Sequence, residues 1–139
     1  MKHHNDGLFC ALVVCGLLVS AVSMPAHHAV AAQYDLDKPI EFSGTVVRME
    51  FVNPHSMLHL EVTNPDGTKT IWMFQTGAIG TLRRLGLVRS SADGGLKPGD
   101  HVTASGFAAR SGNPMGMLKE LRMPTGRVIT TWSGDPNNN

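Results

Sequence analysis

The sequence predicts a mostly β protein, a small antiparallel barrel of five to six strands with one short helix between the third and fourth strands. Three observations lead to this expectation. Short segments alternate apolar and polar residues with a period of two, and turn sequences rich in Pro and Gly separate them. One segment, 76–85, changes to a spacing of three residues between its apolar positions. The length of 139 residues fits a single domain.

The first predicted strand covers residues 40–52 and follows a polar lead-in segment at 33–39. Its apolar positions change parity just after Gly44, which predicts a bulge or bend there. A long strand bent at a glycine can serve both halves of a small barrel. Pro54 ends the strand, because proline cannot donate a ladder hydrogen bond.

The second and third strands are predicted at 56–63 and 69–75, joined by an Asn-Pro-Asp-Gly β-turn. In the second strand, alternation assigns one set of side chains to the core: Leu58, Leu60 and Val62. The opposite face carries His55, Met57, His59 and Glu61. In the third strand, Trp72 and Phe74 share a face.

A short helix is predicted at 76–85, with Thr76 as its cap and Gly86 after its end. The remaining strands are predicted at 101–109, 118–123 and 127–132. Three consecutive strands, a helix and a further hairpin follow the order of an OB-fold. We therefore expect an OB-like barrel over residues 33–132 and a disordered tail at 133–139.

The N-terminal residues 1–26 are predicted to form a secretory signal peptide. Residues 8–22 are apolar apart from one serine, follow Lys2, and precede small residues. The alternative is a transmembrane anchor, which needs about 20 residues. We expect export to the periplasm, with an extracellular location as the alternative and no stable membrane span after cleavage.

Cysteine usage and charge exclude several classes of function. Cys10 and Cys15 both lie in the apolar run, so the mature chain would have no disulfide, thiol nucleophile or cysteine-based zinc site. Cleavage leaves 11 basic and 10 acidic residues of the original 12 and 11. A near-neutral domain lacks the positive surface on which nucleic-acid binding depends, so we expect no nucleic-acid partner.

The cleavage position decides whether two histidines remain. A cut after Ala26 would leave His27 and His28 at the mature N-terminus, where the α-amine and the ring of His27 could chelate Cu(II). A later cut, after Ala31 or Ala32, fits the small-x-small pattern better and removes both histidines. The alternative interpretation is that both are cleavage-region residues without a role.

The sequence resembles a family of small exported bacterial proteins whose domain has no assigned function. The motifs that carry the resemblance are Tyr34-Asp35-x-Asp37-Lys38-Pro39, Gly44-Thr45-Val46, Asn53-Pro54-His55, Arg83-Arg84 and Leu96-Lys97-Pro98-Gly99-Asp100. Family members often carry His-His-Ser near the mature start, and this chain has His27-His28-Ala29. The resemblance implies export and a small β fold, and it implies no activity.

A metal site is one candidate function. His55, Met57 and His59 have equal parity, about 7 Å apart along one strand face. Imidazole suits copper, zinc or nickel, and a thioether suits Cu(I). His27 and His28, or Met115 and Met117, could complete such a site if the fold brings them near. The alternative is a solvated strand face on which these residues are incidental.

The Asn53-Pro54-His55 corner is a second candidate. In its structural interpretation, the His55 ring fixes the bend and Asn53 bonds its own turn. In its functional interpretation, His55 contacts a ligand in a groove with Trp72. A binding face of Trp72 and Phe74 with Arg48 and Arg110 is also conceivable, but the two aromatic residues fit a core better.

No catalytic motif is present in the sequence: it contains no nucleophile elbow, phosphate loop or His-Glu zinc motif. We therefore expect a non-enzymatic exported module that binds a small ligand or an envelope protein, with Asn53, His55 and Trp72 as binding residues and no certain cofactor. The alternative is a periplasmic copper or transition-metal protein with ligands among His27, His28, His55, Met57 and His59.

Overall fold

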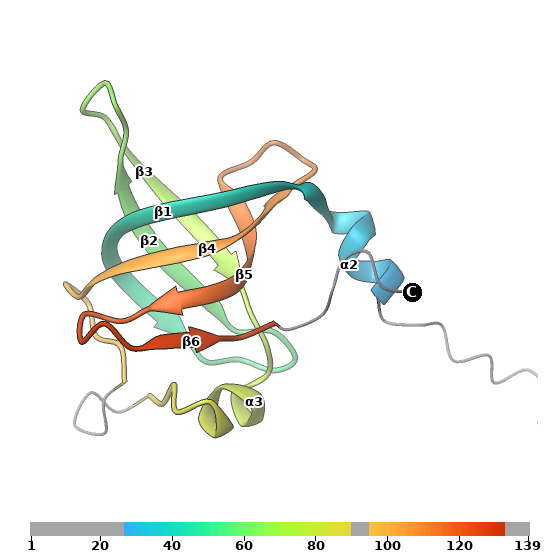
Figure 1. Cartoon of the computed structure of the whole chain (residues 1–139), viewed down its shortest axis with the longest axis vertical. Helices are drawn as coiled ribbons and strands as arrows, with labels where there is room; N and C mark the ends of the chain where they lie inside the picture. The colour runs from blue at the N-terminus through green and yellow to red at the C-terminus, as the bar shows by residue number, and fades with distance from the viewer. Residues whose placement is uncertain (1–26, 90–94, 133–139) are drawn as a thin grey trace, which may run out of the picture.

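The computed structural model describes residues 27–89 and 95–132 (Figure 1). This part is mostly β, as predicted, with six strands and two short helices. In chain order the elements are α2 (His27–Gln33), β1 (Tyr34–Glu50), β2 (Met57–Thr63), β3 (Lys69–Gln75), α3 (Ile79–Arg84), β4 (His101–Ala109), β5 (Met115–Arg122) and β6 (Val128–Thr130). The predicted signal peptide at 1–26 and the predicted tail at 133–139 lie outside the described residues.

The strands form one sheet in the order β3-β2-β1-β4-β5-β6, with antiparallel neighbours. A further, parallel pairing joins β3 to β5, so that β1 to β5 form a closed ring. We call this β3–β5 pairing the seam of the ring. There the amide of Met73 donates a hydrogen bond to the carbonyl of Pro114 at 3.0 Å. The ring leaves β6 as the last strand of the sheet, paired to β5 alone.

The 17-residue strand β1 pairs with β4 through its first part and with β2 through its last part. The predicted bend is confirmed as a register shift between Val46 and Arg48 in the pairing with β2. A side chain at Gly44 would collide with the carbonyl oxygen of Glu61, so only glycine fits where the two strands come this close.

The expectation of a lead-in segment at 33–39 was wrong, because β1 already begins at Tyr34. Tyr34 pairs with Ala109, and the register shifts between Tyr34 and Pro39. Proline is tolerated in a strand at such an irregularity, so Pro39 does not prevent pairing with β4. The strand also ends at Glu50, two residues before the predicted end.

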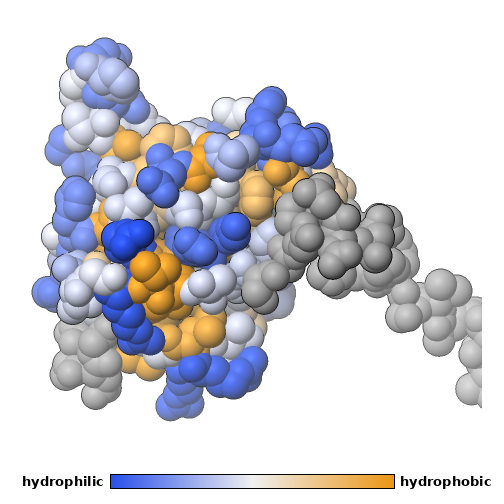
Figure 2. All heavy atoms as spheres, viewed as in Figure 1, coloured by the Kyte–Doolittle hydropathy of each residue, from blue (hydrophilic) through white to orange (hydrophobic). Residues whose placement is uncertain are grey.

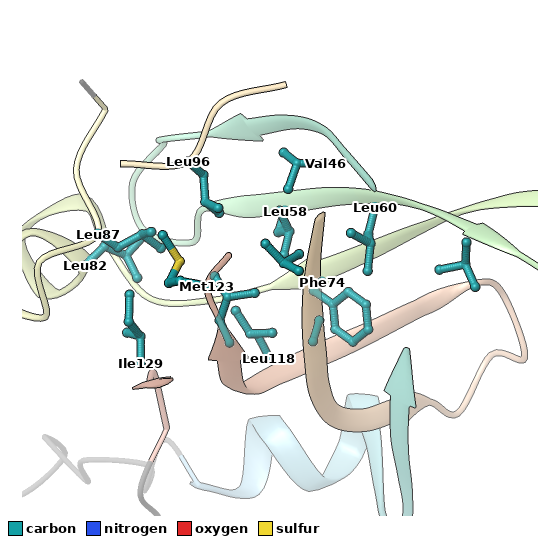
Figure 3. Close-up of a cluster of buried hydrophobic side chains, with 14 residues drawn as sticks. Val46, Leu58, Leu60, Phe74, Leu82, Leu87, Leu96, Leu118, Met123 and Ile129 are labelled. Carbon is teal, nitrogen blue, oxygen red and sulfur yellow. The ribbon is translucent and has the colours of Figure 1, made fainter. Parts of the chain in front are cut away.

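The main core fills the inside of the ring (Figure 3). Leu58, Leu60 and Val62 are buried there, as the alternation of β2 predicted. At one end of the ring, Leu82 of α3 and Leu87 lie beside Met123. A fully buried side chain of this size contributes about 1.5–3 kcal/mol relative to exposure, which explains why α3 is held against the ring despite its six residues.

A second cluster lies on the outer face of the ring. It consists of the buried residues Tyr34, Phe107, Ala109 and Met117, with Val30, Leu36, Met115 and Trp132 packed against them. Arg110 fixes α2 beside this cluster: its Nε donates to the carbonyl of Ala31 at 2.8 Å, and its amide donates to the carbonyl of Gln33 at 3.0 Å. These bonds satisfy carbonyl groups at the C-terminal end of the helix.

The face shown in Figure 2 is polar over most of its area, and its apolar parts are small and bordered by hydrophilic residues. The tip of the β2–β3 hairpin is hydrophilic as well (Figures 1 and 2). Among residues 27–89 and 95–132, neither helix has the length and apolar character needed to cross a bilayer.

Candidate functional site

The Asn-Pro-His corner between β1 and β2 is tied to the end of β3. The amide of Ser56 donates to the carbonyl of Gly77 at 3.1 Å, and the amide of Thr76 donates to the carbonyl of Ser56 at 2.9 Å. The Ser56 side chain is fully buried, and its hydroxyl donates to the carbonyl of Val52 at 3.1 Å. The corner is therefore held in place from both sides.

Asn53 of this corner caps α3, which begins 26 residues later. Its Oδ1 accepts a hydrogen bond from the amide of Ile79 at 3.1 Å. Ala78, at the helix N-cap, supplies no side-chain bond. Asn53 thus satisfies one of the free amides of the first helical turn. Thr76 was predicted to cap this helix, and that prediction was wrong, because the helix begins three residues after it.

A pocket of about 160 Å³ adjoins the corner. Its apolar wall comes from α2, β5 and the segment after β6, with Val30, Met117, Leu118 and Trp132. Its polar wall comes from the corner, the end of β3 and the segment after β6, with His55, Gln75, Thr76 and Thr131, and Gly77 completes the lining.

Most of the pocket's side chains are held by defined contacts. The Tyr34 hydroxyl donates to Gln75 Oε1 at 3.0 Å, and the Thr131 hydroxyl donates to the carbonyl of Leu118 at 2.7 Å. Trp132 packs edge-on against Phe107, with 5.6 Å between the ring centroids. The site is therefore largely preformed, as binding pockets usually are.

The hydroxyl oxygen of Thr76 is buried and has no hydrogen-bond partner among the described residues. The whole residue is only 6% exposed. A buried hydroxyl without a partner costs about 1–3 kcal/mol, so native structures rarely leave one unsatisfied. A group that enters the adjoining pocket could supply the missing bond.

A second hollow, of about 260 Å³, lies over β1, β4 and β5 and is more open than the first. Its polar side chains, Glu41, Ser105 and Lys119, are at least partly exposed and therefore solvated. No buried polar group of the described chain is left unsatisfied at its wall. This hollow is the weaker candidate despite its larger volume.

The three expected ligand-binding residues are not brought together. His55 is exposed and lines the pocket, whereas Asn53 is used for the cap of α3. Trp72 points toward the main core, with 4.3 Å between its ring centroid and that of Phe42. The tryptophan beside His55 is Trp132, which sequence reasoning missed because it belongs to the end of the chain and not to the barrel face.

The structure describes the side chains of three of the five expected metal ligands, and their surroundings differ. His27 and His28 fall in α2, and their side chains lie outside the described part. His55 is at the pocket, Met57 is partly exposed on β2, and His59 is buried. Within residues 27–89 and 95–132, no three side chains of His, Cys, Asp or Glu converge as a metal site would require.

His59 has an unusual environment. Its Nε2 lies 3.1 Å from Glu50 Oε1, but the two groups lack hydrogen-bond geometry, so the contact is a close polar approach. Burial lowers the pKa of His59, the Arg48 guanidinium lowers it further, and Glu50 acts in the opposite direction. A hydrogen bond from Arg48 lowers the pKa of Glu50. The imidazole is therefore neutral and Glu50 ionised near pH 7.

The capping role of Asn53 leads to a stability prediction. Replacement by alanine should lower the free energy of unfolding by about 1 kcal/mol, since it removes the side-chain acceptor at the start of α3. Urea denaturation followed by circular dichroism measures this change. Asn113→Ala is the matched control, because Asn113 is exposed and bonds only through its backbone within the described part of the chain. Equal stability of the two variants would contradict the cap.

Comparison with known proteins places the chain in a family. Residues 14–119 match DUF6152, a family of unknown function, and no curated protein matches the sequence. The match extends from the apolar N-terminal run into β5, and it includes the corner and most of the pocket wall. Because it covers more than half of the chain, the protein belongs to DUF6152.

Proposed function

We propose that this protein is an exported, non-enzymatic module with an OB-like barrel that binds a small ligand in the pocket beside α2. The observation that carries the proposal is the buried, unpartnered hydroxyl of Thr76 in the pocket wall. The nearby Gln75 amide and His55 ring provide further polar groups, and Trp132 provides an apolar surface.

The strand order supports the OB-like description. An OB-fold is a five-stranded Greek-key barrel, and β1 to β5 here pair in a closed ring. The short helix α3 lies between β3 and β4 and covers one end of the ring through Leu82. β6 is an addition at the edge of the sheet.

The pocket favours an uncharged ligand with an oxygen acceptor and a small apolar body. None of its described lining residues is Lys, Arg, Asp or Glu. Tyr34 already occupies Gln75 Oε1, so the donor side of the Gln75 amide is the part left for a ligand. Amides, ketones and esters have such acceptors.

The same contacts support a binding role over catalysis. A hydroxyl nucleophile needs an adjacent base, and the Thr76 hydroxyl has no hydrogen-bond partner in the described chain. The protein would then act by binding a ligand between the pocket walls. A hydrolase or redox activity that depends on His55 would contradict this part of the proposal.

The position of α2 supports export with cleavage after Ala26. A cut after Ala31 or Ala32 would remove Val30 from the pocket wall and Ala31 from its bond with Arg110. The earlier cut keeps both contacts and leaves His27 and His28 in the mature protein. The periplasm is the proposed location, and the extracellular space is the alternative.

The cleavage position is directly measurable. The intact mass of the exported protein, purified from its own compartment, should correspond to a chain that begins at His27. Ala26→Leu should block processing, because the cleavage site needs a small residue, and Ala31→Leu should be processed normally. A mature chain that begins at Ala32 or Gln33 would contradict the proposal.

The ligand proposal predicts the effect of Thr76→Val, which removes the hydroxyl and keeps the shape. We would screen small uncharged amides, ketones and esters by ligand-observed NMR on the exported protein. Compounds bound by the natural protein should bind the variant about tenfold more weakly, as expected for one lost hydrogen bond.

The control for this screen is Thr130→Val at an exposed site on β6, which should bind like the natural protein. The stability of Thr76→Val should be unchanged or higher, because no protein partner loses a bond. Equal binding by both variants, or a marked loss of stability in Thr76→Val alone, would overturn the assignment of Thr76.

A further inference from the structure

The strand register aligns three side chains with soft donor atoms on the outer face of the ring. His59 on β2 pairs with Met73 on β3, and Met73 pairs with Met115 on β5. Residues directly opposite each other in a ladder project to the same face. Phe74, next to Met73, is buried in the main core, so Met73 and its partners project outward.

A second row of paired residues lies beside the row formed by His59, Met73 and Met115. Met57 on β2 pairs with Gln75 on β3, and Gln75 pairs with Met117 on β5. The two rows together present one imidazole and four thioethers on this face. Neighbouring strands are about 4.8 Å apart, so the long methionine side chains of adjacent strands can reach a common point.

Apolar packing accounts for only part of this arrangement. Met117 is buried in the outer cluster, and Met115 packs against it. Met57 and Met73 are partly exposed and contribute to neither hydrophobic cluster of the described chain. Packing in a hydrophobic core therefore does not explain why Met57 and Met73 lie on the same face as His59.

The surrounding charges favour a monovalent soft ion. The four methionine thioethers carry no charge. The charged groups beside them are Glu50, close to His59 Nε2, and Arg48, which pairs with Glu50 at 2.6 Å. Thioether sulfur is a soft donor that favours Cu(I), and imidazole suits copper as well.

We propose that His59, Met73 and Met115 form a Cu(I) site on the outer face of β2, β3 and β5, with Met57 and Met117 beside it. This set differs from the one expected from sequence, since His55 belongs to the pocket and Met73 comes from the neighbouring strand. The proposal does not depend on the small-ligand function of the pocket.

The test is an anaerobic Cu(I) titration of the exported protein against the chromogenic chelator bicinchoninate. One Cu(I) should bind per chain in competition with the chelator. The double variant Met73→Leu, Met115→Leu keeps side-chain volume and removes both sulfur atoms. Its affinity for Cu(I) should fall more than tenfold, because even indirect partners of a metal ligand contribute about 10–100-fold.

The matched control is Met123→Leu, which makes the same change in the main core and should bind Cu(I) like the natural protein. Circular dichroism checks that each variant is folded, and the single variant Met73→Leu carries the test if the double variant is not. His27→Ala distinguishes an amino-terminal copper site. Absence of chelator-competitive binding, undiminished affinity in the methionine variants, or loss of binding in His27→Ala alone would overturn the proposal.

Discussion

The parallel pairing of β3 with β5 is the constraint on which the rest of the structure depends. It closes β1 to β5 into a ring, and the hydrogen bond from the Met73 amide to the Pro114 carbonyl lies at this seam. On the inner side of the β3–β5 pairing, Phe74 packs beside Gly116, where a side chain on the glycine would crowd Ile40 and Phe74. Outside it, the same pairing aligns the methionine rows and brings Gln75 beside Met117 in the pocket.

The Asn-Pro-His corner connects the end of β3 to α3. Through Ser56 it is bonded to the end of β3, and through Asn53 it caps α3. His55, between these two anchors, makes no hydrogen bond in the described chain and lies at the pocket. The structural role of the corner therefore differs from the expected one, since Asn53 bonds α3 and not its own turn.

Local patterns predicted much of the fold. Alternation placed Leu58, Leu60 and Val62 in the core, and the change of parity after Gly44 predicted the bulge in β1. The start of β1 was missed because its residues are polar and include Pro39, and their pairing with β4 depends on a register shift that has no local signal. The six-residue α3 was predicted about three residues too early.

The candidate sites could be predicted only in part, because their geometry is nonlocal. The cap from Asn53 to Ile79, the meeting of His55 with Trp132, and the burial of His59 against Glu50 all join residues from different elements. The His59–Met73–Met115 row depends on the register of a parallel pair between the third and fifth strands. No periodicity within one strand specifies that register.

Amide hydrogen exchange at Met73, measured by NMR, tests the closure of the ring most directly. The account predicts that this amide exchanges as slowly as that of Val46, which donates to the carbonyl of Asp100 within the ring. Both should open only when the ring unfolds. Exchange at Met73 as fast as at Gly67, in the exposed hairpin turn, would show that the β3–β5 seam is open. The β3–β5 pairing would then not hold the pocket walls and the methionine rows in their positions.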